Sequence, residues 1–478
     1  MSAVHAASLS MRSLAPLVAT ALLLAGCVSD PVTSTHEKPL AAGDVGLSGP
    51  ATAPRPDDAW WRALHDPQLD QLIATALARN PGLAGSLARV RVAREQANVA
   101  GSAAKPQVTL DGFEYRQRFS ENYIFPPPYG GGTFWEGRLA FNLNWHLDFW
   151  GRQAALIEQS GHVADAVALD ATTVELMLSS AVAQAYLELA RAHRMEHLAL
   201  QAQTQRGALL DLTNQRVGAG LDSKAELRAA ESNLEQSAVD IEQARLAAVM
   251  ARNALAALTG TSLAAAPALS PPTIDFDLAL PVPGALPADL LARRPDVRAA
   301  QLRIDAATAG RAAARANFYP NIDLVAYAGL SAIGLDEMLQ GDSRMWGVGP
   351  AIHLPIFDAG RLQAEYRRSG AELDAAVASY NDTVVRAVRE AADQSARLRS
   401  FELQLDAQQR ALKSAEQSYD LAAQRYSAGL TNQVSVLNAE TQVLAARRQR
   451  TQMLADRTSA RIALLVALGG HFSQEPAR

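Results

Sequence analysis

Apolar and polar side chains alternate along several stretches of the chain. Between Arg138 and Phe149, the odd positions from 139 onward are large and apolar, whereas most even positions carry arginine, asparagine, histidine or aspartate. A period of two recurs in 322–330 and 346–356. Because successive side chains of a strand point to opposite faces, these stretches are predicted to be strands with one apolar and one polar face. Such strands are typical of a membrane β-barrel, although a half-buried soluble sheet gives the same alternation.

Two further features favour the barrel over the soluble sheet. FPPPYGGG at 125–132 is rich in proline and glycine, which a strand interior does not accommodate, so it is predicted to be an exposed loop between two strands. Aromatic residues lie near the ends of the predicted strands, as at a membrane interface; they are Phe113, Tyr115, Trp135, Trp145 and Trp346.

Elsewhere the apolar residues follow helical spacing, in 68–104, 152–217 and 287–318. The segment 152–217 contains no proline, and at 1.5 Å per residue it would extend for about 100 Å. Its apolar positions alternate steps of 7 and 4 residues, a period of about 3.67 per turn that favours straight or slightly right-handed packing. A long coiled-coil stalk has a similar periodicity, so periodicity alone leaves both interpretations open.

The chain contains two copies of one sequence pattern. RVGAGLDS at 216–223 returns as RYSAGLTN at 425–432, and LARNPGL at 77–83 returns as LARRPDV at 291–297. Many collinear matches of this kind indicate an internal duplication of about 210 residues. Each repeat is predicted to contain a helix, two strands, a long helix, a turn and a helix. The predicted domains are repeat 1 at 67–260, a proline-rich linker at 261–285, repeat 2 at 286–470 and a tail at 471–478.

Four strands per chain cannot close a barrel. Open strand edges are not tolerated in lipid, so several chains are expected to share one barrel. Two copies would give an eight-stranded barrel, and side chains would fill its interior. Three copies give twelve strands and room for a pore.

The only cysteine, Cys27, lies in a secretory context. Arg12 precedes an apolar run at 14–24, and LAGC follows. This order predicts a lipoprotein signal peptide at 1–26, a lipidated Cys27 and a lipid-anchored N-terminal segment at 27–66. An ordinary buried thiol after an ordinary signal peptide is the alternative, and Met1 and Met11 are both candidate start codons. Val28 and Ser29, rather than an aspartate, come directly after Cys27; by the sorting rule of the lipoprotein family, this favours the outer membrane.

Composition narrows the function classes. Apolar residues make up 49% of the 478 residues but aromatics only 6%, so alanine-rich, closely packed helices are expected. The net charge of −5 argues against nucleic-acid binding. The sequence lacks a cysteine pair, an HExxH motif and a phosphate-binding loop after a strand, so we expect no enzyme, cofactor or metal site. His146 and His353 lie in predicted strands, where a lumen-facing or interfacial role is favoured over metal ligation.

Several phrases together resemble the outer-membrane efflux lipoproteins, the NodT/TolC-like outer components of RND-type tripartite pumps. They are the 57–83 segment containing DDAWWRALHDPQL, FYPNIDL at 318–324, LPIFDAGR at 354–361 and the two R-x-x-x-G-L turns. The resemblance covers 28–478. It implies an α+β membrane protein: a homotrimer with a shared twelve-stranded barrel and a long α-helical periplasmic tunnel. An equatorial region is expected from 28–66, 261–285 and the tail.

The resemblance also implies a function and partners. The protein would passively conduct small toxic compounds out of the periplasm, together with a periplasmic adaptor and an inner-membrane RND transporter. A TolC-like exit duct of a type I secretion system is the alternative; the lipobox favours efflux. A structural coiled-coil lipoprotein would not need the alternating strands. Drugs, aromatic acids, solvents and metal ions all remain open as cargo.

Finally, the resemblance assigns roles to residues of the two repeated turns. The turns would form the periplasmic tip that meets the adaptor, with both glycines at positive φ and both arginines as docking residues or helix caps. The tip residues are Arg216, Gly220, Leu221, Arg425, Gly429 and Leu430. Relatives carry an apolar residue and an aspartate at the gate. Here those positions are Val434 and Asn438, so a charged ring is not expected from them; Glu440 and Glu231 lie nearby and alternatively face neighbouring helices.

Overall fold

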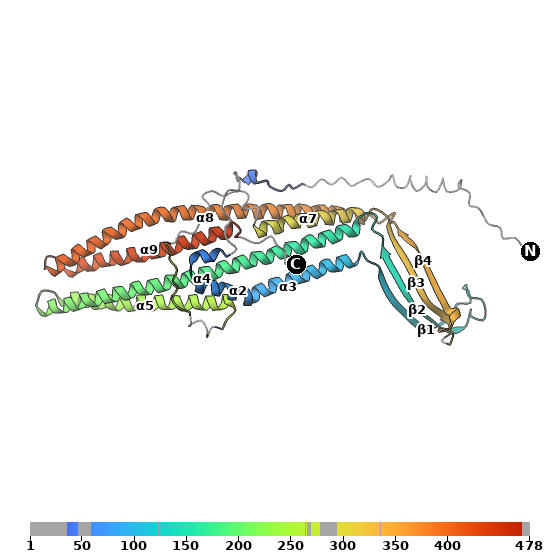
Figure 1. Cartoon of the computed structure of the whole chain (residues 1–478), viewed down its shortest axis with the longest axis horizontal. Coiled ribbons are helices and arrows are strands. Elements are labelled where there is room, and N and C mark those ends of the chain that lie inside the picture. Colours follow the sequence, from blue (N-terminus) through green and yellow to red (C-terminus); the bar gives the residue numbers. More distant parts are fainter. Residues whose placement is uncertain are drawn as a thin grey trace, which may run out of the picture. The chain divides into compact units, whose positions relative to one another are not determined.

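The structure is a computed structural model that describes residues 36–45, 59–122, 124–262, 264, 269–277, 294–334 and 336–470 (Figure 1). The predicted signal peptide, Cys27, part of the proline-rich linker and the C-terminal tail lie outside these residues. The chain divides into two compact units. The first comprises Met1–Lys38, Ala93–Ala164 and Arg303–Ala378; the second comprises Pro39–Val92, Asp165–Leu302 and Ser379–Arg478.

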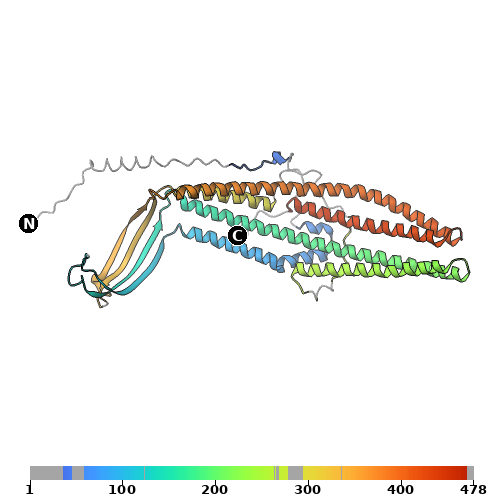
Figure 2. The same ribbon diagram turned by 180° about the vertical axis from the view of Figure 1, so that it is seen from behind.

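The first unit contains a four-stranded antiparallel sheet in chain order (Figures 1 and 2). Its strands are β1 (Gln107–Arg118), β2 (Thr133–His146), β3 (Asn321–Ile333) and β4 (Arg344–His353). The central pairing, β2 with β3, joins the two repeats. Trp145 lies opposite Leu324, and His146 lies opposite Asp323. Directly opposed residues share a face, so the sheet has one apolar and one polar face, as the alternation predicts.

Two predicted strand ends are wrong by a few residues. The alternation continues to Phe149, but β2 ends at His146 because the chain then turns: the Phe149 amide donates to the Leu147 carbonyl at 2.9 Å. β4 ends at His353 rather than at 356, where Pro355 follows and cannot donate a ladder hydrogen bond. The segment at 125–132 is a loop, as expected.

Two helices of equal length dominate the fold. α4 (Arg152–Gly218) and α8 (Arg361–Ser427) each have 67 residues and begin 209 residues apart. Each continues through a short turn into a partner helix, α5 (Lys224–Thr259) or α9 (Gln433–Ala467). The shorter helices α3 (Pro81–Ser102) and α7 (Pro295–Ala316) precede the two strand pairs. The same order of elements in both halves confirms the duplication.

The helix expected over 68–104 is two helices, α2 (Pro67–Arg79) and α3. Asn80 between them is extended, with ψ of 122°, because the ring of Pro81 disfavours the helical conformation of the preceding residue. The Asn80 side chain then accepts a hydrogen bond from the Leu83 amide at 3.1 Å and caps α3. The proline therefore ends one helix and begins the next.

Asp66 organises the core of the second unit. Its carboxylate is buried and accepts hydrogen bonds from the Gln68 amide at 3.0 Å, from the Tyr186 hydroxyl at 2.9 Å and from the amide and hydroxyl of Thr273, both at 3.0 Å. Burial and the bond to Asp66 raise the pKa of Tyr186 well above its ordinary value. One carboxylate thus joins α2, α4 and the segment 269–277. The apolar core of the same unit includes Trp60, Leu69, Ile73, Leu255 and Phe276.

By length and composition alone, α4 contains an 18-residue window, of mean hydropathy 1.4, that could cross a membrane; a third of this window is buried. Leu178, Val182 and Tyr186 of this helix belong to the core of the second unit. At 67 residues, α4 is far longer than the roughly 20 residues that span a bilayer. We therefore attribute its apolar character to packing between helices.

Candidate functional site

The two repeated turns join α4 to α5 and α8 to α9, at the ends of two helical hairpins (Figure 1). Gly220 and Gly429 adopt φ of +71° and +72°. The Leu221 amide donates to the Arg216 carbonyl, and the Leu430 amide to the Arg425 carbonyl, each at 2.8 Å. These bonds close the last turn of each long helix, as in a Schellman-type end.

The helices that leave the turns are capped by side chains. Ser223 and Glu226 form a reciprocal capping box at the start of α5, and Asn432 accepts a hydrogen bond from the Ser435 amide at the start of α9. Each turn is therefore stabilised locally from both sides.

Arg216 lies in a compact cluster that joins the two hairpins. Its guanidinium donates to both oxygens of Asp222, at 2.9 and 3.2 Å, and lies 4.5 Å from the ring centroid of Tyr426. The Tyr426 hydroxyl donates to Asp222 at 2.5 Å. We call Arg216, Asp222 and Tyr426 the latch. The hydrogen bonds from Arg216 hold the pKa of Asp222 below its ordinary value, although burial opposes this.

The two turns differ in their side chains although their backbones match. Counting 209 residues, Val217 corresponds to Tyr426 and Thr431 to Asp222, so the second copy lacks both partners of the arginine. Arg425 is accordingly exposed, whereas the Arg216 side chain is only 14% exposed. Two apolar side chains at the turns are open to solvent; they are Leu221 and Leu430.

The predicted gate residues lie in two environments. Val434 and Asn438 are both exposed, one helical turn apart on α9. Glu440 is buried and lies with its Oε1 3.4 Å from Nε of Arg206. Glu231 instead makes an ion pair with the exposed Arg228 within α5. Glu440 thus faces a neighbouring helix, which was the alternative interpretation, and only Val434 and Asn438 remain together on an open surface.

Arg206 anchors the buried charge of Glu440 within the helix bundle. Its Nη1 donates to the Asn233 carbonyl at 2.9 Å and to the Ser237 hydroxyl at 3.1 Å. Burial raises the pKa of Glu440, and Arg206 lowers it only in part. Near the latch, the fully buried Gln433 donates to Thr213 at 2.7 Å. The helices are therefore joined by polar as well as apolar contacts.

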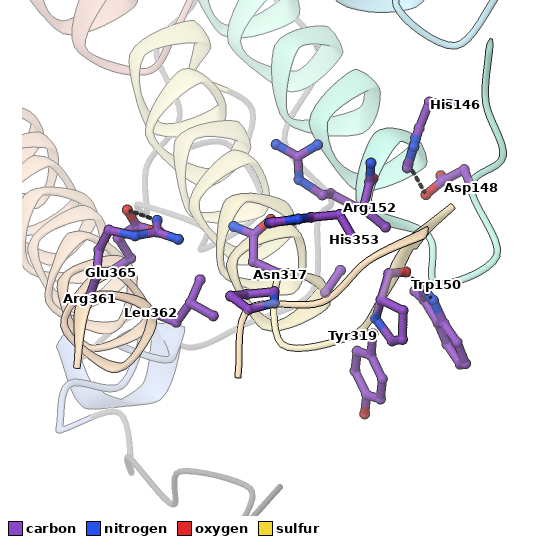
Figure 3. A pocket seen from close by; sticks show the side chains of 14 residues that line it. His146, Asp148, Trp150, Arg152, Asn317, Tyr319, His353, Arg361, Leu362 and Glu365 are labelled. Atoms are coloured by element: carbon purple, nitrogen blue, oxygen red, sulfur yellow. Dashed lines mark hydrogen bonds and ion pairs between the residues drawn. The ribbon is translucent and has the colours of Figure 1, made fainter. Parts of the chain in front are cut away.

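A cavity of about 430 Å³ lies at the end of the sheet where the strands meet the helices (Figure 3). His146 and His353 both line it, and His146 Nδ1 lies 3.0 Å from Asp323. Within the described ranges, no group of three histidine, cysteine or carboxylate side chains could hold a metal ion.

Sequence reasoning did not identify Asp222, Tyr426, Arg206 or the cavity. For the latch, a signal was present: the two copies of the turn differ at the positions of Asp222 and Tyr426. A duplicated motif that departs from its own copy at two polar positions marks a place where the copies have different roles.

A four-stranded sheet continuing into two 67-residue helices, duplicated within one chain, defines the class of TolC-like outer-membrane channel proteins. The family model described as "Outer membrane efflux protein" matches residues 72–261 and 286–470, and the chain belongs to that family. The chain is accordingly the outer-membrane component of an efflux pump, and its family is one of channels rather than enzymes.

Individual relatives agree with this assignment. The fusaric acid resistance protein FusA of Burkholderia cepacia is 37% identical over 357 residues, which is 73% of this chain and 67% of FusA. The toluene efflux pump outer membrane protein TtgC of Pseudomonas putida is 30% identical over 97% of this chain and 96% of its own. The crystal structure of VceC from Vibrio cholerae superimposes with a TM-score of 0.81 at 30% identity, covering 87% of this chain and all of VceC.

Proposed function

We propose that three copies of the chain form one conduit, which works with a periplasmic adaptor and an inner-membrane RND transporter. The observation that carries this proposal is the sheet: within the described chain, β1 and β4 each pair on one side only. Unpaired edges are not tolerated in lipid, and three sheets joined edge to edge give a twelve-stranded barrel. Large side chains on the apolar face are exposed, as lipid contact requires; they include Leu110, Phe141, Trp346 and Val348.

The assembly is tested by native mass spectrometry of the detergent-solubilised protein. The expected mass is about three times that of the mature chain, since the barrel needs twelve strands. A monomer that retains its strand signal in circular dichroism would contradict the shared barrel.

We infer that the cargo consists of small toxic organic compounds. FusA is named for resistance to fusaric acid and TtgC for toluene efflux, and both span most of this chain. Deleting the gene and measuring growth in each compound tests this inference. Unchanged growth in a panel of such compounds, with the partner pump expressed, would contradict it.

The adaptor is proposed to dock on the tip formed by the two turns. Arg425, Leu221 and Leu430 are open to solvent and supply charge and apolar surface, whereas Arg216 contributes through the latch. Arg425→Glu reverses the offered charge and leaves the backbone of the turn intact. Cross-linking to the adaptor and efflux should both fall while trimers still reach the outer membrane.

Arg410→Glu is the matched control, because Arg410 is also exposed on α8 but lies fifteen residues before Arg425. Arg216→Glu combined with Arg425→Glu should impair cross-linking further, since it also opens the latch. Wild-type cross-linking in the double variant would show that the turns only end helices.

The gate is proposed to lie just beyond the second turn, at Val434 and Asn438, with the latch holding it closed. The latch is suited to this role because it joins the first turn to Tyr426 of the second hairpin through one buried carboxylate. Replacing either Asp222 or Tyr426 removes the link without touching the exposed surface.

A lipid on Cys27 is proposed to anchor the N-terminal segment. The amides of His36 and Glu37 donate to Asp374 of α8, at 3.0 and 3.3 Å. Asp374 lies thirteen residues into α8, or about 20 Å from its start near the sheet. His36 lies nine residues after Cys27, a separation that can span up to about 30 Å in a fully extended chain, so the lipid can reach the membrane edge.

The equatorial region is proposed to include residues 59–66 and 269–277. Phe276 is fully buried; Arg194 of α4 lies 4.0 Å from its ring centroid, and Arg457 of α9 donates to its carbonyl at 2.8 Å. The segment therefore contacts one helix of each hairpin, α4 and α9, which supports a role as a belt around them.

A further inference from the structure

The cavity at the end of the sheet opens on the polar face. His146 and His353 belong to the polar face of the strands, opposite Asp323 and Asn321 in the register. In a barrel with its apolar face toward lipid, this face lines the conduit. The cavity holds about 430 Å³, a volume in the range of small-molecule sites.

Two charged groups of opposite sign line this cavity without using their full bonding capacity. Asp148 accepts a hydrogen bond from the Ala154 amide through Oδ2, at 2.8 Å, and caps the first turn of α4. Its Oδ1 is buried and has no hydrogen-bond partner among the described residues; His146 Nε2, at 3.8 Å, is too distant. Arg152 makes no ion pair or hydrogen bond within the described chain.

The duplication supplies an internal comparison. In the second repeat, Asp358 caps α8 and uses both oxygens, accepting from the Gly360 amide at 3.0 Å and the Leu362 amide at 2.9 Å. Arg361 corresponds to Arg152 and pairs with Glu365 at 2.9 Å. The position of Glu365 is taken by Leu156 in the first repeat. The shared arginine is thus paired in the second repeat and, among the described residues, unpaired in the first. Asp148 corresponds in position to Phe357 and Asp358 to Phe149, so the free oxygen of Asp148 is a feature of the first repeat alone.

An aromatic surface adjoins these groups. Trp150 and Tyr319 are stacked, with ring centroids 4.9 Å apart and planes 18° from parallel. The Trp150 indole N–H donates to the Pro320 carbonyl at 2.9 Å, which fixes the ring although about half of the residue is exposed. Figure 3 shows this pair side by side at one end of the cavity, with Arg152, Asn317 and His353 toward the other.

We propose that this cavity is a transient binding site for small aromatic zwitterions, compounds that carry a carboxylate and a cationic nitrogen on an aromatic ring. Arg152 would bind the carboxylate, Oδ1 of Asp148 the cationic nitrogen, and the exposed face of the stacked rings the aromatic part. Binding in a conduit has to be weak enough for release. The inference rests on the proposed conduit function and adds a preferred class of cargo.

The test uses the full-length protein in detergent and four probes: 4-(aminomethyl)benzoate, benzoate, benzylamine and glycine. Titration calorimetry or ligand-observed NMR gives the dissociation constants. The wild type should bind the aromatic zwitterion most tightly. Arg152→Gln should weaken the binding of 4-(aminomethyl)benzoate and of benzoate about tenfold, the loss expected for one charge-assisted hydrogen bond. The affinity for benzylamine should stay unchanged. Asp148→Asn keeps the helix cap and should weaken the binding of 4-(aminomethyl)benzoate and of benzylamine, but not that of benzoate.

Arg138→Gln is the control, since Arg138 lies on the polar face of β2 but does not line the cavity. Equal effects of Arg138→Gln and Arg152→Gln, or equal affinity for all four probes, would overturn the inference. Conductance in planar bilayers separates it from the proposed function. A conducting protein without selective probe binding refutes the site alone, whereas a protein that forms no conducting pore refutes the conduit and the site with it.

Discussion

Removing Arg206 should destabilise the helix bundle around Glu440 far more than neutralising Glu440 itself. The two side chains are only 9% and 5% exposed, and their charged atoms lie 3.4 Å apart. Removing one partner of such a pair leaves a buried, uncompensated charge, at a cost of about 3–5 kcal/mol. Arg206→Leu should therefore lose about that much local stability.

Glu440→Gln should cost about 1 kcal/mol or less, because Arg206 keeps its acceptors on Asn233 and Ser237. Burial raises the pKa of Glu440 because desolvation penalises the charged carboxylate, and a neutral glutamine does not incur this penalty. Replacing both partners by leucine should recover most of the loss, since apolar pairs of similar volume often match a buried ion pair.

The dependence of stability on pH tests the direction of this effect independently. A carboxylate with a raised folded pKa contributes stability that is fully present below its ordinary value of 4.5 and is lost as the pH rises through the folded value. In Arg206→Leu the pKa of Glu440 should be raised further, because the compensating cation is gone. The loss of stability relative to the wild type should therefore be largest at neutral pH and shrink toward about pH 5. Asp222 has a lowered pKa, so the latch should persist over the same range.

Hydrogen exchange measured by mass spectrometry, corrected for intrinsic rates, gives the local opening free energy of α9. We expect the amides of α9 to exchange faster in Arg206→Leu than in Glu440→Gln. The two exchange rates should converge as the pH falls. Equal exchange in both variants, or a defect that does not shrink on acidification, would refute the assignment of Glu440 as a buried charge held by Arg206.

Three other predictions follow from the structure and the proposals. Asp222→Asn and Tyr426→Phe should each raise the conductance of the purified channel in planar bilayers. Unchanged conductance would show that the latch does not hold the gate closed. Asp66→Ala should destabilise the protein by about 2–4 kcal/mol because it removes a helix cap and leaves buried donors unpaired, while Tyr186→Phe should cost about 1 kcal/mol; thermal melting compares the two. Mass spectrometry of the mature N-terminus should find a diacylated Cys27, and an unmodified cysteine would disprove the anchor.

The elements of the fold were predictable because they depend on local pattern. The alternation around Phe141 predicted a strand within a few residues of its ends, and the absence of proline over 152–217 predicted α4. The positive φ of Gly220 and Gly429 followed from the need to end a helix sharply. The membrane anchor at Cys27 remains a prediction, because that residue lies outside the described part of the chain.

The side-chain contacts were less accessible. Asp222 and Tyr426 are 204 residues apart, and no local pattern indicates that two residues so distant in sequence form a hydrogen bond. The burial of Glu440 was equally hidden, because a glutamate on a polar helix face has the same sequence signature whether it faces a lumen or an arginine. Such contacts depend on which helical faces meet, and that is set by packing of the whole hairpins.

The equal length of α4 and α8 limits how the gene can change. Deleting seven residues from one long helix would draw its turn back by about 10 Å, while the turn of the other repeat stayed in place and the latch came apart. A viable change in length would need matching deletions in both limbs of both hairpins, four events instead of one. Length is therefore expected to drift far more slowly than sequence in these helices, and natural length variants should differ by the same number of residues in all four.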